Sequence, residues 1–207
     1  PNGEYDHLSF GETAEVEIEY ELSDGNGGFS TATATVTVSG LNSGPDGGTA
    51  NDTGQVTERP DGAVDDNIAV LTSSGIIAFS DVDAGDVHDA SFEALGNGYR
   101  GTFTVAVTDP TSDDGQGEVT WEFNINDADI DDLAAGQTLV QVYTITIDDN
   151  NGGVITQDVT ITLNGTNDAP EFTGGTDSGG VTELVDDAAG ENSEILSADG
   201  TLNFADV

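Results

Sequence analysis

Thr138-Leu-Val-Gln-Val-Tyr-Thr-Ile-Thr-Ile147 and Thr156-Gln-Asp-Val-Thr-Ile-Thr-Leu163 alternate apolar and polar residues, and Asp148-Asp-Asn-Asn-Gly-Gly153 lies between them. A period of two places one set of side chains on a single face, which is typical of half-buried β-strands. Asn and Gly tolerate the positive φ angles that tight β-hairpin turns require. The stretch therefore predicts an antiparallel β-hairpin.

The same hairpin pattern occurs earlier in the chain, in Ala14–Leu22 and Phe29–Val38. Leu8, Gly11, Thr13, Asp24, Asn26, Gly27 and Gly28 all recur 125 positions later, without a gap. Val56-Thr-Glu58 returns as Val181-Thr-Glu183, and Phe79-Ser-Asp-Val82 returns as Phe204-Ala-Asp-Val207. A fixed period indicates an array of similar modules. We therefore predict that 46–170 is a complete repeat, 1–45 the C-terminal part of one repeat, and 171–207 the N-terminal part of the next.

The rest of the complete repeat also has the pattern of short strands. Val, Ile, Thr, Phe and Trp121 occupy the other strand candidates, which are Gln55–Glu58, Ile68–Leu71, Gly75–Phe79, His88–Leu95, Gly101–Thr108 and Glu118–Ile125. About seven strands with frequent turn signals predict an all-β fold of tandem antiparallel β-sandwiches of immunoglobulin or cadherin type.

Between these strands we expect less regular structure. The Asp-rich Asp127–Ala135 predicts a loop or a single helical turn. The Gly-rich and Asn-rich segments 40–54 and 165–180 predict linkers or the irregular start of the next repeat. On the strands, Trp121 and Tyr143 are expected in the core, whereas His7 and His88 are expected on the surface or in loops.

The composition excludes several classes of partner. The chain has 41 acidic residues against two arginines, and a formal net charge of −39. Such a surface repels nucleic acid and anionic lipid. No apolar stretch approaches the roughly 20 residues of a membrane-spanning helix. The apolar residues are clustered in alternating runs, which argues against disorder. Without cysteine, disulfides cannot brace the fold, so packing or bound metal must do so.

The acidic and Asn residues gather in loops at the predicted strand ends: Asp81–Asp86, Asp127–Asp132, Asp148–Asn151 and Gly165–Pro170. Ca²⁺ takes six to eight oxygen ligands from carboxylates, amides and carbonyls. Asp81 and Asp83 can point the same way because they are two apart in an extended segment. No single loop has an EF-hand or β-roll consensus. Any calcium site must therefore be assembled from several loops.

Five segments together carry a family resemblance: Val56–Glu58, Phe79–Asp83, Ile130–Leu133, Asp149–Gly153 and Gly165-Thr-Asn-Asp-Ala-Pro170. They resemble the VCBS and cadherin-like repeats of RTX-type bacterial adhesins secreted by type I systems, and the resemblance covers the whole chain. It implies an extracellular, calcium-stiffened stalk of tandem sandwiches on or released from a Gram-negative surface, in contact with neighbouring repeats and, as a further candidate, with neighbouring chains.

The resemblance to cadherins implies Ca²⁺ at the junctions between consecutive units. At the second junction it implies five ligands: Glu58, Asp131, Asn167, Asp168 and Asp206. At the first junction it implies Asp6, Asn42, Asp81, Asp83 and Asp149. The chain departs from the pattern at Ser43, which stands where the second linker has Asp168. We therefore expect weaker calcium binding, or a different ligand set, at the first junction.

These observations favour a non-enzymatic spacer of an adhesin that supports cell adhesion or biofilm formation. One alternative is a glycan-binding or surface-binding module that uses loops 84–101 or 109–117; another is an accessory module of a secreted hydrolase. Asp131 and Asp132 could suggest a glycosidase, but they belong to a repeating framework. His7 and His88 have no Cys partner and do not recur, so zinc is disfavoured. Arg59 is expected to pair with nearby acids and Arg100 to lie in a surface turn.

Overall fold

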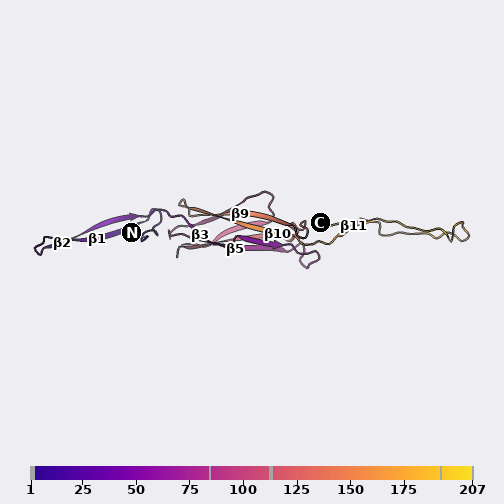
Figure 1. Ribbon diagram of the computed structural model, residues 1–207, viewed down its shortest axis with the longest axis horizontal. Helices are drawn as coiled ribbons and strands as arrows, with labels where there is room; N and C mark the ends of the chain where they lie inside the picture. The colour runs from indigo at the N-terminus through magenta and orange to yellow at the C-terminus, as the bar shows by residue number, and fades with distance from the viewer. Residues whose placement is uncertain (1–2, 84, 112–113, 192, 207) are drawn as a thin grey trace.

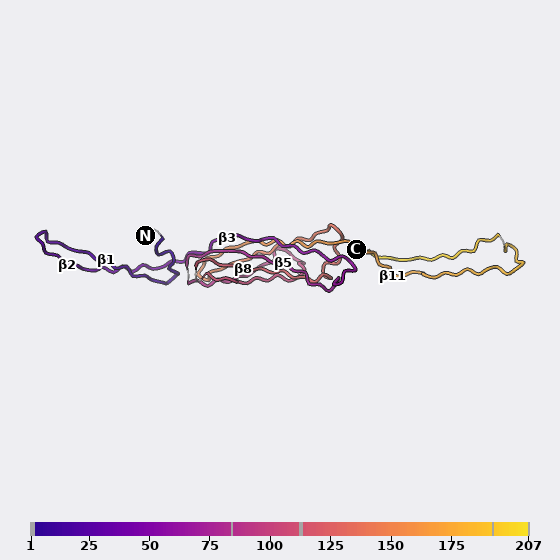
Figure 2. The backbone as a smooth tube through the Cα atoms, turned by 90° about the horizontal axis from the view of Figure 1, so that it is seen from below, coloured from indigo at the N-terminus to yellow at the C-terminus, as the bar shows by residue number. Residues whose placement is uncertain are grey.

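The computed structural model describes residues 3–83, 85–111, 114–191 and 193–206 as an elongated molecule. A central sandwich lies between two projecting hairpins, one at each end of the long axis (Figures 1 and 2). The first hairpin is formed by β1 (Thr13–Ser23) and β2 (Phe29–Ser39), and the second by β11 (Glu171–Gly175) and β12 (Leu202–Ala205). No helix among the described residues is long and apolar enough to cross a membrane.

The sandwich consists of two four-stranded sheets. One has the order β3-β5-β8-β7, with β3 (Asp46–Ala50), β5 (Val70–Ser80), β8 (Gln116–Asn126) and β7 (Thr102–Asp109). The other has the order β4-β10-β9-β6, with β4 (Thr53–Thr57), β10 (Val154–Asn164), β9 (Thr138–Asp148) and β6 (Asp89–Ala94). The predicted all-β sandwich is confirmed. Its one departure from antiparallel order among the described strands is the parallel pairing of β4 with β10.

The core forms where alternate residues of the two sheets face each other. The ring of Phe103 stacks on Tyr143, with centroids 4.2 Å apart, and also lies parallel to Trp121. Trp121 is completely buried and Tyr143 almost so, which confirms both predictions. Each fully buried large apolar side chain contributes about 1.5–3 kcal/mol, so this core supplies the main stabilisation in the absence of disulfides.

Strand β5 corrects one prediction. The sequence suggested two strands, Ile68–Leu71 and Gly75–Phe79, but a single strand covers Val70–Ser80. Gly75 does not interrupt it. A Cβ at Gly75 would lie 2.6 Å from Cζ2 of Trp121, so glycine is needed there because the indole ring lies against the backbone.

The two segments predicted as linkers or as irregular repeat starts contain the short strands Asp46–Ala50 and Glu171–Gly175, so the linker alternative is wrong for these residues. Both are edge strands with an irregular register. An irregular edge strand tolerates glycines that would weaken a central one. The Asp-rich segment forms the one-turn 3₁₀ helix η1 (Asp127–Asp129), as predicted.

The strand register follows the 125-residue offset. Thr13 pairs with Ser39 in β1–β2, and their equivalents Thr138 and Asn164 pair in β9–β10. Gly47 pairs with Phe79, and their equivalents Phe172 and Phe204 pair in β11–β12. The division at 45 and 170 stays a prediction.

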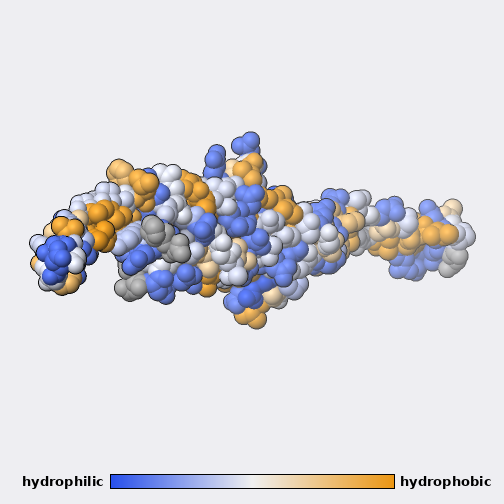
Figure 3. All heavy atoms as spheres, turned by 60° about the vertical axis from the view of Figure 1, so that its left-hand side comes forward, coloured by the Kyte–Doolittle hydropathy of each residue, from blue (hydrophilic) through white to orange (hydrophobic). Residues whose placement is uncertain are grey.

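The hairpins differ from the sandwich in what covers them. Leu22 and Phe204 are mostly exposed, whereas their equivalents Ile147 and Phe79 are buried. Figure 3 shows apolar residues along the projecting hairpins. An isolated two-stranded hairpin is marginally stable in water, so most of the folding free energy resides in the sandwich.

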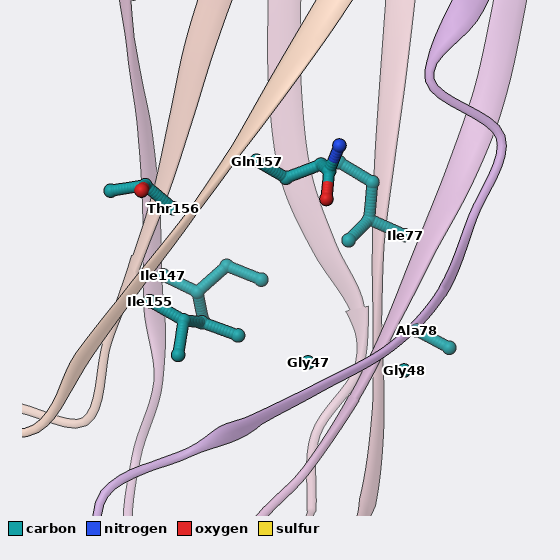
Figure 4. Close-up of a pocket in the computed structure, with 8 residues that line it drawn as sticks. All are labelled: Gly47, Gly48, Ile77, Ala78, Ile147, Ile155, Thr156 and Gln157. Carbon is teal, nitrogen blue, oxygen red and sulfur yellow. The ribbon is translucent and has the colours of Figure 1, made fainter.

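A cleft of about 260 Å³ opens between the two sheets beside β3 (Figure 4). Its wall includes Gly47, Gly48, Ile77, Ile147 and Ile155. Gly47 shares a face with the buried Phe79 because the two residues are directly paired, and a Cβ at Gly47 would meet nothing within 4 Å. The next unit carries Phe172 at this position. The sandwich therefore lacks, at Gly47, the aromatic ring that the sequence has 125 residues later at Phe172.

We expect Gly47→Phe to raise the unfolding free energy by about 0.5–2 kcal/mol, because it fills apolar space. Urea denaturation followed by circular dichroism measures the change. Gly48→Val is the matched control. Its Cβ would lie 2.9 Å from the backbone oxygen of Ala78, so this variant should lose stability. A Gly47→Phe protein no more stable than the wild type would show that the cleft does not accept the ring.

Candidate metal centres at the two ends of the sandwich

Acidic side chains gather at opposite ends of the sandwich, where strands give way to loops. Asp81 follows the end of β5 and Asp149 follows the end of β9, so both lie at the end nearer the β1–β2 hairpin. Glu58 follows β4 and Asp168 lies beyond β10, at the other end. The first cluster is Asn42, Asp81, Asp83, Asp86 and Asp149. The second cluster is Glu58, Asp61, Asp66, Asp131 and Asp168.

In the first cluster, carboxylate oxygens of Asp81, Asp86 and Asp149 lie within 4.8 Å of one another. The linker joins them: the Asn42 side-chain amide donates to Asp149 Oδ2 at 2.9 Å, and the Ser43 N–H donates to Asp83 Oδ2 at 2.7 Å. Burial alone would raise the pKa of Asp149, but hydrogen bonds from Asn42 and the hairpin N–H groups hold that pKa below its usual value. Asp149 is therefore held as an anion.

Other oxygens in the first cluster have no donor. Oδ1 of Asn42, Oδ1 of Asp83 and Oδ2 of Asp86 are buried without a hydrogen-bond partner among the described residues. Burial raises the pKa of Asp83, and the negative charges of Asp86, Asp81 and Asp149 raise it further, against the Ser43 N–H. A bound cation would supply the missing partner and remove this repulsion.

The second cluster has two overlapping groups. Oxygens of Glu58, Asp131 and Asp168 lie within 4.8 Å of one another, as do oxygens of Asp61, Asp66 and Asp131. Asp131 belongs to both groups, so the cluster is continuous. A hollow of about 350 Å³ beside it is lined by Asp61, Asp131 and Asp168 and also by Asp206, which follows β12. Residues on both sides of the second linker therefore meet here.

The second cluster leaves more charge uncompensated than the first. Oε1 of Glu58, Oδ1 of Asp66, Oδ1 of Asp131 and both carboxylate oxygens of Asp168 are buried without a hydrogen-bond partner among the described residues. Burial, and then neighbouring carboxylates, raise the pKa values of Glu58, Asp131 and Asp168. The Thr166 N–H, 2.7 Å from Glu58 Oε2, opposes the rise for Glu58.

The two arginines hold the loops of the second cluster through acids outside it. Arg100 forms a bidentate pair with Asp132, next to Asp131, and hydrogen bonding to Arg100 lowers the pKa of Asp132. Arg59 Nη1 lies 3.8 Å from Asp65, which confirms the expected local pairing. Arg100 lies on the surface as expected, but it has a specific partner. Neither arginine neutralises a cluster carboxylate.

The structure brings together most of the residues that the sequence proposed as ligands. Glu58, Asp131 and Asp168 meet, with Asp206 on the wall of the same hollow, and Asn42, Asp81, Asp83 and Asp149 also meet. Two residues stand apart. Asn167 is exposed and its amide donates to the Asp168 carbonyl, whereas Asp6 is exposed and no described contact joins it to the first cluster. The role of all ten residues as ligands stays a prediction.

Sequence reasoning missed Asp61, Asp66 and Asp86, which belong to the clusters. Asp86 lies in the Asp81–Asp86 segment, whose acidic density was visible. Asp61 and Asp66 lie in the loop after Glu58, and nothing in their spacing identifies them.

His88 lies in a loop, just before β6, which is one of the two places expected for it. Its side chain is nevertheless buried, with the residue 5 % exposed, because its ring packs on Phe79 and its Nε2 atom lies 3.0 Å from Asp81 Oδ2. His7 is exposed, as expected.

The buried oxygens agree with the requirements of Ca²⁺. That ion is bound by six to eight hard oxygen ligands in flexible geometry, including carboxylates and amide oxygens. Each cluster offers only such atoms, from several loops, and no cysteine is present. The donor set therefore fits calcium and gives no support to a thiolate-bound metal.

Comparisons with known proteins give remote structural likenesses. No family model and no curated protein matches the chain. Cadherin domains 1–5 of protocadherin gamma B2 are similar with a TM-score of 0.40 and 15% identity, covering 89% of this chain and 31% of that one. Mouse clustered PcdhgC3 EC1–3 has a TM-score of 0.38 and 15% identity, with coverages of 83% and 49%. Zebrafish RET cadherin-like domains 1–4 have a TM-score of 0.35 and 11% identity, covering 75% of this chain and 34% of that one.

The chain thus spans less than half the length of each of these three structures. Because every TM-score is below 0.5, these likenesses carry no argument about function.

Proposed function

We propose that this chain is a calcium-braced spacer segment of an extracellular repeat adhesin. One observation carries the proposal. Among the described residues, eight buried side-chain oxygens lack a hydrogen-bond partner, and all eight belong to the two clusters. Buried acceptors without donors are costly, and a divalent cation at each end would pair them. The one other described buried side-chain polar atom without a partner is the nitrogen Nε of Arg59, which directly follows Glu58 of the second cluster.

The location of the clusters supports a mechanical role. The first cluster is tied to the linker through Asn42 and Ser43. At the second, the Thr166 N–H donates to Glu58 and the Ala169 N–H donates to Asp61 at 2.8 Å. A cation at either cluster would therefore hold a linker against the sandwich and keep consecutive units in line, in the elongated arrangement of Figure 1.

In this proposal the chain is non-enzymatic and lies on or near a bacterial surface after type I secretion. Its partners are calcium ions, neighbouring repeats and neighbouring chains. Two observations support weaker calcium binding at the first cluster. Its linker has Ser43 where the second has an aspartate, and it has three buried oxygens without a partner, against five at the second cluster.

A glycan-binding module would need an aromatic side chain that can stack on a sugar, and Trp121 cannot serve because it is completely buried. Tyr99 is half-buried, and its hydroxyl accepts the Val142 N–H at 3.0 Å. Positions 84 and 112–113 of the two loops considered for ligand binding lie outside the described residues.

Removal of calcium with EGTA should lower the melting temperature and shorten the hydrodynamic length. Extracellular modules bind Ca²⁺ with dissociation constants of roughly 10⁻⁴–10⁻³ M. At ten times such a constant each site adds about 1.4 kcal/mol, or roughly 4–6 °C in a domain of this size. Differential scanning calorimetry and small-angle X-ray scattering measure the two effects. Unchanged melting temperature and length would contradict the proposal.

Asp168→Ala should abolish the stabilisation by calcium at the second cluster and leave the stabilisation at the first cluster unchanged. The exposed Asp109, outside both clusters, provides the matched control Asp109→Ala. In Asp168→Ala, the distribution of distances between spin labels placed on either side of a linker should become broader at the second linker only.

A further inference from the structure

His88 is an unusual residue for its place in the fold. It is one of two histidines in a chain with 41 acids, yet its side chain is fully buried at the end of the sandwich. It lies just before β6 and reaches back to Asp81, which follows β5. Its other ring nitrogen, Nδ1, lies 3.4 Å from the hydroxyl of Thr111, which is also completely buried. Three separate segments therefore meet in one chain of hydrogen bonds.

The chemistry of the partners assigns the direction of these bonds. An ionised carboxylate only accepts, so Nε2 carries the hydrogen and donates to Asp81 Oδ2. Nδ1 lies within hydrogen-bond reach of the Thr111 hydroxyl. The second oxygen of Asp81, Oδ1, accepts the Asp83 N–H at 2.9 Å. The Asp81 carboxylate is thus held by one donor on each oxygen.

Asp81 is the carboxylate that links the first cluster to the core of the sandwich, through His88. Asp149 and Asp83 are held by the linker and by hairpin backbone, whereas Asp81 is held by a ring that packs on Phe79 with centroids 4.8 Å apart. The imidazole N–H orients the Asp81 carboxylate through a single hydrogen bond, and the rest of the ring is fixed by packing on Phe79. An arginine here would compete with the cation for the carboxylate.

We propose that His88 is a positioning residue for the cation of the first cluster: it fixes the Asp81 carboxylate toward Asp86 and Asp149. This inference rests on the proposed calcium-binding function. Outer partners of metal ligands typically contribute 10–100-fold to metal affinity.

The test isolates the first cluster by using Asp168→Ala as the background. His88→Phe keeps an aromatic ring against Phe79 but removes the donor, whereas His88→Gln retains an N–H donor in place of Nε2. Calorimetric titration with calcium chloride should show an affinity about 10–100-fold lower for His88→Phe. His88→Gln should recover most of the loss. In the calcium-free wild type, ¹⁵N NMR of the ring should show hydrogen on Nε2, the atom that donates to Asp81.

Each outcome decides the question. A merely structural role would lower the melting temperature of both calcium-free variants and leave the calcium affinity unchanged, which would overturn the inference. Equal loss in His88→Phe and His88→Gln would also overturn it, because the donor would not matter. If Asp168→Ala itself binds no calcium, the first cluster is not a calcium site, and the proposed function fails there before His88 is considered. If His88→Phe does not fold, Thr111→Val replaces it, and unchanged affinity in that variant counts against the proposal.

Discussion

Replacing Trp121 with alanine should lower the free energy of unfolding by about 3–5 kcal/mol, the range for removal of a large aromatic side chain from a core. The indole is completely buried, and its Nε1–H donates to the Asn51 carbonyl at 2.7 Å. Gly54 and Gly75 lie so close to the ring that a Cβ at either would be within 2.8 Å of it. Because backbone surrounds the ring, the cavity cannot collapse and the loss should fall in the upper part of the range.

Urea denaturation followed by far-ultraviolet circular dichroism measures this loss without relying on the tryptophan signal. Trp121→Phe should recover part of the stability, since it retains stacking on Phe103 but loses the hydrogen bond to Asn51. Tyr20→Ala is the matched control, because Tyr20 is 54 % exposed on the β1–β2 hairpin. If both alanine variants lost the same small amount, Trp121 would not be the centre of the core, and its availability as a sugar-stacking residue would have to be reconsidered.

The elements that the sequence predicts well are those whose period is undisturbed. The alternating runs of β9 and β10 identify both strands within one or two residues, because each buries one face against the opposite sheet. The same argument places Trp121 and Tyr143 in the core. The repeat offset also predicts which residues pair in the two terminal hairpins.

Prediction fails where glycine has a role other than to end a strand. Gly75 accommodates the indole of Trp121 inside β5, and Gly47 and Gly48 belong to an edge strand. The parallel pairing of β4 with β10 could not be foreseen, because Thr53–Thr57 and Thr160–Asn164 are distant in sequence and local pattern does not fix strand direction.

The residues of the two clusters also fall into those that the sequence predicts and those that only the fold reveals. Glu58, Asp131 and Asp168 follow the order expected from the family resemblance, and the fold brings them together. Asp61 and Asp66 join them only because the loop after Glu58 is folded back, with its N–H groups on the Asp127 carboxylate. The burial of His88 within its loop could not be foreseen, because a polar residue beside a strand is usually exposed and only the tertiary contact with Asp81 explains it.

The calcium-free protein should become more stable as the pH falls from 7 toward about 4, opposite to the usual acid destabilisation of proteins. The folded-state pKa values of Glu58, Asp83, Asp131 and Asp168 are raised, chiefly by burial and then by neighbouring carboxylates. A raised carboxyl pKa favours the protonated folded state. Its contribution is fully present below the ordinary value of about 4 and is lost as the pH rises through the raised value.

Two other effects determine the pH range over which acid stabilises the calcium-free protein. Protonation also reduces the repulsion from a net charge of −39, which acts in the same direction. Asp132 and Asp149 have lowered pKa values, through Arg100 and through Asn42 and hairpin N–H groups respectively. Their contributions are present above the ordinary value and are lost as the pH falls through the lowered ones. Stability should therefore pass through a maximum near about pH 4–5 and fall below it.

With calcium bound the dependence should reverse, because protons compete with the cation for the same carboxylates. The melting temperature in excess calcium should exceed that in EGTA at pH 7, and the two curves should converge as the pH approaches about 4–5. Asp131→Asn combined with Asp168→Asn should flatten the acid-induced rise in EGTA and remove most of the calcium effect, whereas Asp109→Asn should alter neither. A calcium-free melting temperature that is constant or falls between pH 7 and 5 would show that these carboxylates are not crowded, and would remove the electrostatic reason for a cation at the sandwich ends.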